Sequence, residues 1–300
     1  MASDGQMPGI PEDLLEREAG KVSARYRVDL ADAREALAGA FAARPDLARR
    51  VRERHGEEDV TRWREYREAV KSCRKALYYG LRRYYADAHD VERTVEELER
   101  AAQEGRPADA VEGLRRRLLD AHVSTRERAP HEEEFFTQLF DVCGAPGAVL
   151  DVGCGMQPLC YPFAGRGAAT ALYVAADRDE RAVRAAAAWG RIAAPGRLTA
   201  VQADLGDPLW TAALPAREPY DLALMLKVVP VLSRLDRAAA EALGRAPAAR
   251  LLVTGCVESM TRRQRIEARE RSVLRRFLAA AERAVVGEFR AGNEFGYLAE

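Results

Sequence analysis

The spacing of hydrophobic residues changes part-way along the chain. Between about residues 12 and 121 they recur every three or four positions, which is the period of an amphipathic helix. From about residue 148 onward, short apolar runs alternate with helical segments, which is typical of a parallel sheet covered by helices. We therefore expect a helical region over residues 1–130 and an α/β domain over residues 131–300, with the boundary between His122 and His131.

The helical region is expected to form a small bundle. Its helices are predicted at Glu12–Gly20, Asp29–Ala43, Val60–Tyr85 and, as a hairpin turning at Gly105–Pro107, Asp90–Ala121. Pro45 is expected to break the helical pattern after the second of them. One more helix, His131–Val142, leads into the α/β domain.

The predicted helix Val60–Tyr85 has a basic face beside its apolar face. The basic positions are Arg64, Arg67, Lys71, Arg74, Lys75 and Arg82. Between Arg44 and Tyr85 the chain holds thirteen Arg and Lys residues and seven Asp and Glu residues, although the formal net charge of the whole protein is +0. This local surplus favours binding to nucleic-acid phosphates, and the alternative is an ordinary solvated helix face.

The α/β domain is predicted to alternate strands and helices and to close with a hairpin. The strands are expected at Ala148–Val152, Ala171–Ala176, Leu198–Ala203, Asp221–Leu226 and Arg250–Val257, followed by a helix at Thr261–Ala284 and a hairpin of Ala284–Phe289 with Glu294–Leu298.

A glycine loop follows the first of these strands. Gly153-Cys154-Gly155 lets the backbone turn tightly under a ligand, and Pro158 suits the first turn of a helix. Pro158 also stands where a dinucleotide fingerprint needs its third glycine, which disfavours hydride transfer. Asp177 follows the second strand, where a carboxylate can accept hydrogen bonds from ribose hydroxyls, and Asp204-Leu205 after the third strand suits an adenine.

These features together indicate a nucleoside-binding site, and the alternative is an α/β turn without a ligand. The series resembles the S-adenosylmethionine-binding core of class I methyltransferases.

Composition limits the remaining possibilities. With 48% hydrophobic residues the chain can form a substantial core. The five cysteines form no C-x-x-C pair and have no clustered histidines, so we expect no metal site and a reducing compartment. No N-terminal leader and no membrane-spanning run is apparent, and we expect a cytoplasmic protein without a membrane partner. Cys154 is expected to be a small loop residue, with a nucleophile as the alternative.

A family resemblance becomes apparent at the segment from His122 to Arg128, HVSTRER. This motif, placed ahead of the glycine loop, resembles the 16S ribosomal RNA (guanine-N7) methyltransferases that confer aminoglycoside resistance. The resemblance extends over most of the chain, and its other parts are Arg25-Tyr26-Arg27, the basic helix around Lys71, Leu150–Leu159, the run KVVPVL at Lys227–Leu232, and NEFGY at Asn293–Tyr297.

The resemblance implies a class I (Rossmann-like) methyltransferase domain with an N-terminal all-helical region that docks on the small ribosomal subunit. It implies S-adenosyl-L-methionine as cofactor, with Arg128 binding the cofactor carboxylate. The alternative role for Arg128 is a surface ion pair with Glu132. The remaining cofactor-binding positions are expected at Asp151, Gly153, Cys154, Gly155, Asp177, Arg178, Asp204 and Leu205. The implied target is N7 of guanosine 1405 in 16S RNA, and we expect the protein to act as a monomer.

Lys227 and Glu294 are the candidate catalytic residues. Lys227 follows the fourth strand, on the substrate side of such a sheet, and a buried lysine needs a partner. Glu294 opens the last strand, where its carboxylate could accept the donors of an extruded guanine, or could be an edge-strand charge that discourages aggregation.

Two positions depart from the family pattern. Ser233 stands where relatives carry a glutamate, and Glu258 stands where they carry a basic residue. We expect these changes to affect target docking more than cofactor binding. The alternative functions are a small-molecule methyltransferase of natural-product biosynthesis and a catalytically silent RNA-binding relative.

Overall fold

The chain divides into two compact units. The computed structural model describes residues 9–26, 30–80, 88–207, 209–215, 219–235, 237–258 and 265–300. The division falls between Arg83 and Tyr84, so the boundary expected between His122 and His131 lies inside the second unit.

The described part of the first unit consists of helices. They are α1 (Glu12–Tyr26), α2 (Leu30–Ala42), α3 (Pro45–Arg54) and α4 (Arg64–Gly80). Leu14, Leu37 and Phe41 form part of its core, in which Phe41 and Tyr66 contact each other with ring centroids 5.2 Å apart. Pro45 begins α3 instead of only ending the preceding pattern, because the first turn of a helix needs no backbone N–H from its residues.

The second unit is built on a sheet covered by helices. Its helices are α5 (Ala88–Gln103), α6 (Glu112–Ala121), α7 (Val123–Arg128), α8 (Glu132–Cys143), α9 (Glu180–Ala193), α10 (Val228–Leu235), α11 (Arg237–Leu243) and α12 (Glu267–Ala280). Its strands are β1 (Ala148–Val152), β2 (Leu172–Asp177), β3 (Leu198–Gln202), β4 (Tyr220–Met225), β5 (Ala248–Cys256), β6 (Val285–Ala291) and β7 (Glu294–Ala299).

The sheet has the order β3-β2-β1-β4-β5-β7-β6. The pairs from β3 to β5 are parallel, whereas β7 lies antiparallel to both β5 and β6. Strands β1 to β3 are added toward one edge of the sheet and β4 is placed on the other side of β1, so the strand order reverses between β1 and β4. Open α/β sheets bind their ligands at this position. The expected α/β fold and its closing hairpin are confirmed.

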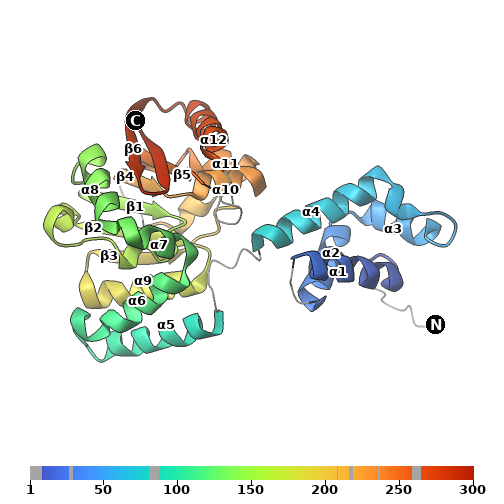
Figure 1. Ribbon diagram of the computed structural model, residues 1–300, viewed down its shortest axis with the longest axis horizontal. Helices are drawn as coiled ribbons and strands as arrows, with labels where there is room; N and C mark the ends of the chain where they lie inside the picture. The colour runs from blue at the N-terminus through green and yellow to red at the C-terminus, as the bar shows by residue number, and fades with distance from the viewer. Residues whose placement is uncertain are drawn as a thin grey trace. The chain divides into compact units, whose positions relative to one another are not determined.

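Helices cover both faces of the sheet (Figure 1), and each face has its own hydrophobic core. Alternate residues of one strand point to opposite faces, so Val149 joins the core under α5, α6, α8 and α9, while Leu150 joins the core under α10, α11 and α12. All five residues of β1 are buried, as a strand covered on both faces requires.

Helices α5 and α6 belong to the sheet unit because α5 packs on α9 and α6 packs on α5. Val95 and Leu98 of α5 are buried in the same core as Trp189 of α9. Arg184 of α9 also donates to both carboxylate oxygens of Glu99 on α5, at 3.0 and 2.6 Å. Helical period alone could not distinguish these helices from those of the first unit, so the boundary was predicted too late in the chain.

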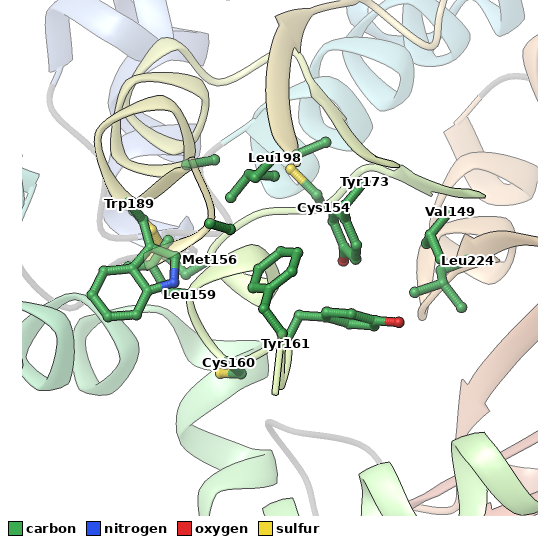
Figure 2. Close-up of a cluster of buried hydrophobic side chains, with 14 of the residues drawn as sticks. Val149, Cys154, Met156, Leu159, Cys160, Tyr161, Tyr173, Trp189, Leu198 and Leu224 are labelled. Atoms are coloured by element: carbon green, nitrogen blue, oxygen red, sulfur yellow. The ribbon is translucent and has the colours of Figure 1, made fainter. Parts of the chain in front are cut away.

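The connection from β1 to β2 differs from the expected helix. Two short 3₁₀ turns, Gln157–Leu159 and Gly165–Ala169, replace it. Pro158 lies inside the first turn, as its fixed φ allows, but Pro162 and the glycines that follow interrupt any longer helix. Met156, Leu159 and Tyr161 anchor this segment in the core with Trp189 (Figure 2).

Close packing of α9 on β3 gives a stability prediction. A Cβ added at Gly190 would lie 2.8 Å from the backbone oxygen of Leu198, whereas one added at Gly113 in α6 would meet nothing within 4 Å. Gly190→Ala should therefore lower the free energy of unfolding by about 1–3 kcal/mol through overpacking. Gly113→Ala should leave it unchanged or raise it by up to about 1 kcal/mol, and urea unfolding of both variants measures the difference. Equal effects would contradict the packing of α9 on β3.

Candidate functional site

The glycine loop after β1 lies at the carboxyl edge of the sheet. Gly153 and Gly155 both have positive φ, +67° and +50°, which other residues rarely adopt. A Cβ on Gly153 would lie 2.4 Å from Cγ2 of Val228, and one on Gly155 would lie 2.7 Å from Cε1 of His122. Space and backbone conformation thus both require glycine at these two positions.

The end of β2 fixes this loop. The N–H groups of Gly153 and Cys154 donate to the Ala176 carbonyl at 2.8 and 3.2 Å. Asp177 accepts from Gly155 N at 2.8 Å and from Asp179 N at 2.9 Å, one bond to each carboxylate oxygen. Burial raises the pKa of Asp177. A carboxylate has about four acceptor sites, so Asp177 can also accept from a ligand hydroxyl.

Asp151 and Cys154 lie under the loop and not on its surface. Asp151 is buried, and the Tyr173 hydroxyl donates to its Oδ2 at 2.6 Å. Burial raises the pKa of Asp151 to about 7. Cys154 is buried in the core that also holds Tyr173 (Figure 2), and burial raises the pKa of its thiol well above the usual range. A protonated, enclosed thiol is a packing residue and no nucleophile.

The other predicted cofactor positions follow β2 and β3. Arg178 is exposed, and its carbonyl accepts from Gln202 Nε2 at 3.2 Å. Asp204 is exposed and accepts from Gly206 N at 2.9 Å, while Leu205 is half-buried. A Cβ on Gly153 would lie 3.4 Å from Cδ1 of Leu205, so this leucine reaches the glycine loop.

Four charged side chains form a network at the same edge of the sheet. Arg128 of α7 bonds Glu294 Oε1 through Nε at 2.9 Å and through Nη2 at 2.7 Å. Lys227 Nζ lies 3.3 Å from the same Glu294 oxygen and 3.2 Å from Glu127 Oε2. Thr254 of β5 donates to Glu294 Oε2 at 3.3 Å. The two cations and two carboxylates sum to zero charge.

Mutual attraction keeps the members of this network ionised. Burial alone would raise the pKa of Glu294, but Arg128 and Lys227 lower it below its usual range. Burial alone would lower the pKa of Lys227, but Glu294 raises it above its usual range. Removing one member would leave a buried charge without its partner, which costs about 3–5 kcal/mol in comparable buried pairs.

The backbone at Lys227 is strained. Its φ is +63°, in the left-handed region that lysine rarely adopts, and its N–H donates to Thr254 Oγ1 at 3.0 Å. Such a conformation costs on the order of 1–3 kcal/mol and is typical of functional sites. The turn directs the chain from β4 into α10 while Lys227 stays in the ion network.

The structure shows what Arg128 and Glu294 bind within the protein. Arg128 is buried and pairs with Glu294, not with Glu132 at the surface. Glu294 is only 3% exposed and accepts from Arg128, Lys227 and Thr254, so in this structure it holds the two cations in place and is not open to a guanine edge. Neither reassignment could come from sequence, because residues 128 and 294 meet only through the fold.

Three further residues at the site had no predicted role. Glu127 precedes Arg128 in the motif and binds Lys227. His122 is buried against Gly155, and burial lowers its pKa to about 4, which keeps the imidazole neutral. Gln157 follows the loop and accepts from Arg128 Nη1. Only their position in the sequence could have identified them, because His122 and Glu127 belong to the HVSTRER motif and Gln157 belongs to the glycine-loop segment.

The predicted RNA-binding positions lie in the first unit. Arg64, Arg67 and Lys71 are exposed on α4, and Arg64 Nε donates to Glu68 Oε1 at 2.9 Å. The side chains of Arg74 and Lys75, and the whole of Arg82, lie outside the described residues. The basic face is thus observed at three of its six expected positions.

The two positions that depart from the family pattern lie in the second unit. Ser233 is half-buried in α10. Glu258 is exposed after β5, where its N–H donates to Asn293 Oδ1 at 2.8 Å.

Within the described part of the chain, no cluster of three or more His, Cys, Asp or Glu residues could hold a metal ion. A search of the same residues for a helix long and apolar enough to cross a membrane found none.

The sheet order, the glycine loop after β1 and the acid after β2 define a class I (Rossmann-like) methyltransferase fold. The chain belongs to the ribosomal RNA methyltransferase (FmrO) family, whose model matches residues 39–289. The fold class and the family resemblance expected from the sequence are therefore confirmed.

Known relatives resemble parts of the chain. A 16S rRNA (guanine(1405)-N(7))-methyltransferase from Micromonospora echinospora is 37% identical over 130 residues, which cover 43% of this chain and 44% of that protein. A protein of the same description from Frankia casuarinae is 31% identical over 200 residues, covering 64% of each chain. The matched stretches thus span less than two thirds of these relatives.

Solved structures resemble the chain over nearly its whole length. The 16S rRNA methyltransferase RmtF, crystallised with S-adenosyl-L-homocysteine, has a TM-score of 0.61 at 23% identity and covers 97% of this chain and 99% of its own. The 16S rRNA methylase RmtB has a TM-score of 0.53 at 20% identity and covers 95% and 98%. At these identities the likeness shows the fold.

The raised pKa of Asp151 predicts a pH effect on stability. An unfolded aspartate titrates near 3.9, whereas native Asp151 titrates at about 7, so the native state holds this proton more tightly. The resulting stabilisation is complete below about pH 4 and is lost as the pH rises through about 7. Asp151→Asn keeps an acceptor for Tyr173 but cannot titrate.

The free energy of unfolding of Asp151→Asn should therefore fall less between pH 5 and 7.5 than that of the wild type, by on the order of a few kcal/mol. Urea unfolding at each pH measures this, with Asp109→Asn, a change at an exposed position, as control. Parallel curves for Asp151→Asn and the wild type would contradict the prediction.

Proposed function

We propose that this protein transfers a methyl group from S-adenosylmethionine to N7 of guanosine 1405 in 16S ribosomal RNA, on the assembled small subunit in the cytoplasm. The observation that carries the proposal is the buried arginine Arg128 beside the glycine loop, at the edge of the sheet where the strand order reverses. The chain that holds it belongs to the ribosomal RNA methyltransferase family. The relatives named for this reaction and the RmtF complex support the same cofactor and target.

The residues at the carboxyl edge suit this cofactor. The glycines at positions 153 and 155 let the loop turn tightly against Val228 and His122, and Asp177 has acceptor capacity for ribose hydroxyls. Asp204 and Leu205 offer an acceptor and an apolar face for adenine. Arg128 supplies donors for the methionine carboxylate. Bound there, S-adenosylmethionine would supply an electrophilic methyl group on a sulfonium.

The protein's task toward the target is positioning. Guanine N7 has a free lone pair at neutral pH, so no side chain has to remove a proton before transfer. The residues of the site instead have to hold the base in line with the methyl group. The major groove of A-form RNA is too deep and narrow for side chains, so the guanosine is extruded from its stack. Lys227 is proposed to face the phosphate or base oxygen, with Glu294 and Glu127 holding its ammonium.

Charge on the second unit supports docking of RNA along α12. The acids of α12, Glu267 and Glu270, are buried, so its exposed charged side chains are Arg269, Arg275 and Arg276. Helix α8 has the opposite charge at its start, since its first turn is acidic. Polyanionic RNA would therefore meet this unit on the α12 side, in addition to the basic face of α4.

The direct test is detection of 7-methylguanine in small subunits. Purified subunits incubated with the protein and S-adenosylmethionine should acquire the modification at guanosine 1405, detected by chemical cleavage and primer extension. Cells expressing the protein should resist 4,6-disubstituted deoxystreptamine aminoglycosides. Arg128→Ala should abolish the modification because the cofactor loses its main cation. Methylation of a small molecule, with no mark on the subunit, would overturn the proposal.

The absence of a general base predicts a flat pH profile. Single-turnover methyl transfer at saturating subunit and cofactor should change little between about pH 6 and 8.5. Any inflection near pH 7 that Asp151→Asn removes belongs to the buried Asp151. A tenfold rise in rate per pH unit would instead require a deprotonated nucleophile and would exclude N7.

The basic face of α4 predicts salt-dependent docking. Replacing Arg67 and Lys71 together by Glu should weaken small-subunit binding. Log affinity should then fall less steeply with log salt, the magnitude of the slope decreasing by about 1–2. Cofactor affinity should stay unchanged. The matched control is the same charge change at Arg93 and Arg116, exposed residues of α5 and α6. An unchanged slope in the α4 variant would show that this face is only solvated.

A further inference from the structure

The amide of Gln157 is buried beside Arg128. Gln157 begins the 3₁₀ turn after the glycine loop and is 3% exposed. Its Oε1 accepts from Arg128 Nη1. Because a guanidinium only donates, this bond fixes which end of the amide is oxygen. Nε2 is therefore the donor end, and it has no hydrogen-bond partner in the described part of the protein.

An unused buried donor at this place calls for an acceptor. Leaving a buried amide N–H without a partner costs about 1–3 kcal/mol, and nearly all such groups in folded proteins are bonded. An apolar residue at position 157 would avoid that cost but would leave Arg128 Nη1 without its acceptor. A polar residue is favoured there if a ligand supplies the acceptor.

Arg128 shows what kind of acceptor fits. Its bonds to Glu294 and Gln157 use three of its five N–H groups, and the remaining two are on Nη1 and Nη2. Nη1 and Nη2 thus each keep one N–H, and a pair of guanidinium donors matches the two oxygens of a carboxylate. Gln157 Nε2 belongs to the side chain that binds Nη1 directly, so one anionic group can reach both side chains.

We propose that Gln157 Nε2 is a second donor to the carboxylate of the methionine moiety of S-adenosylmethionine, and that it selects for ligands bearing that carboxylate. The inference rests on the proposed function, since it concerns the same cofactor. The charges of Arg128 and Lys227 are already balanced by Glu127 and Glu294. An amide adds a bond to the carboxylate without adding a charge to this neutral network.

Two substitutions together separate donation from positioning. Gln157→Glu keeps an oxygen that accepts from Arg128 but replaces the Nε2 donor by a second oxygen. Its added negative charge also repels a ligand carboxylate, so weaker binding by this variant counts for donation only where Gln157→Leu binds more weakly as well. If Gln157 donates to the carboxylate, the variant loses that bond. Gln157→Leu removes the donor without adding charge and serves as the second variant.

The readout is ligand affinity by titration calorimetry on the full chain. The probes are S-adenosylhomocysteine and its decarboxylated analogue, which keeps the amine and the adenosine but lacks the carboxylate. Both variants should bind S-adenosylhomocysteine at least about tenfold more weakly than the wild type, the scale of one bond to a charged group. Their affinity for the decarboxylated analogue should change less than about threefold.

Gln138→Glu on α8 is the matched control, because it makes the same chemical change at a half-buried position away from the loop. It should bind both probes like the wild type, and thermal melting should show that every variant is folded.

Wild-type affinity for S-adenosylhomocysteine in either Gln157 variant would overturn this inference and leave the proposed function standing. Equal weakening for both probes would also overturn it, because the effect would not involve the carboxylate. A wild-type protein that binds neither probe would overturn the proposed function itself.

Discussion

The site depends on one buried ion pair, between Arg128 and Glu294. It joins α7, ahead of the sheet, to the last strand of the chain, and both side chains are almost fully enclosed. Further hydrogen bonds help to offset the cost of burying such a pair, and here Lys227 and Thr254 bind Glu294 while Gln157 binds Arg128. The ends of α7, β4, β5 and β7 are thereby fixed at the same edge of the sheet as the glycine loop.

The fold explains how this polar cluster can exist inside the protein. Apolar cores on both faces of the sheet keep the strands in register, so their carboxyl ends form one rigid edge. Backbone bonds from the glycine loop to Ala176 and Asp177 fix the loop against β2. The strained turn at Lys227 completes the edge, and its cost is offset by the packing around it. Charged donors are therefore placed before any ligand arrives, which lowers the entropy lost on binding.

The two units divide the proposed task. The sheet unit holds the proposed cofactor site and an arginine-bearing helix, α12, while the helical unit has an exposed basic face on α4. Helices α5 and α6 belong to the sheet unit because their apolar faces complete the core over α9. In a protein with a formal net charge of +0, attraction to RNA has to come from such local surpluses and not from overall charge.

The sequence by itself determined the strands, most of the longer helices and their order, because hydrophobic period and glycine, proline and acid positions are local properties. Strand ends at Val152 and Asp177, the glycine loop, the closing hairpin and the family motif at His122–Arg128 were all predictable in this way. Only the tertiary structure decided which helices belong to which unit, that Glu294 binds Arg128 and Lys227, and that Gln157 lies beside them. These contacts join residues up to 166 positions apart, and no local pattern specifies which distant side chains a folded sheet brings together.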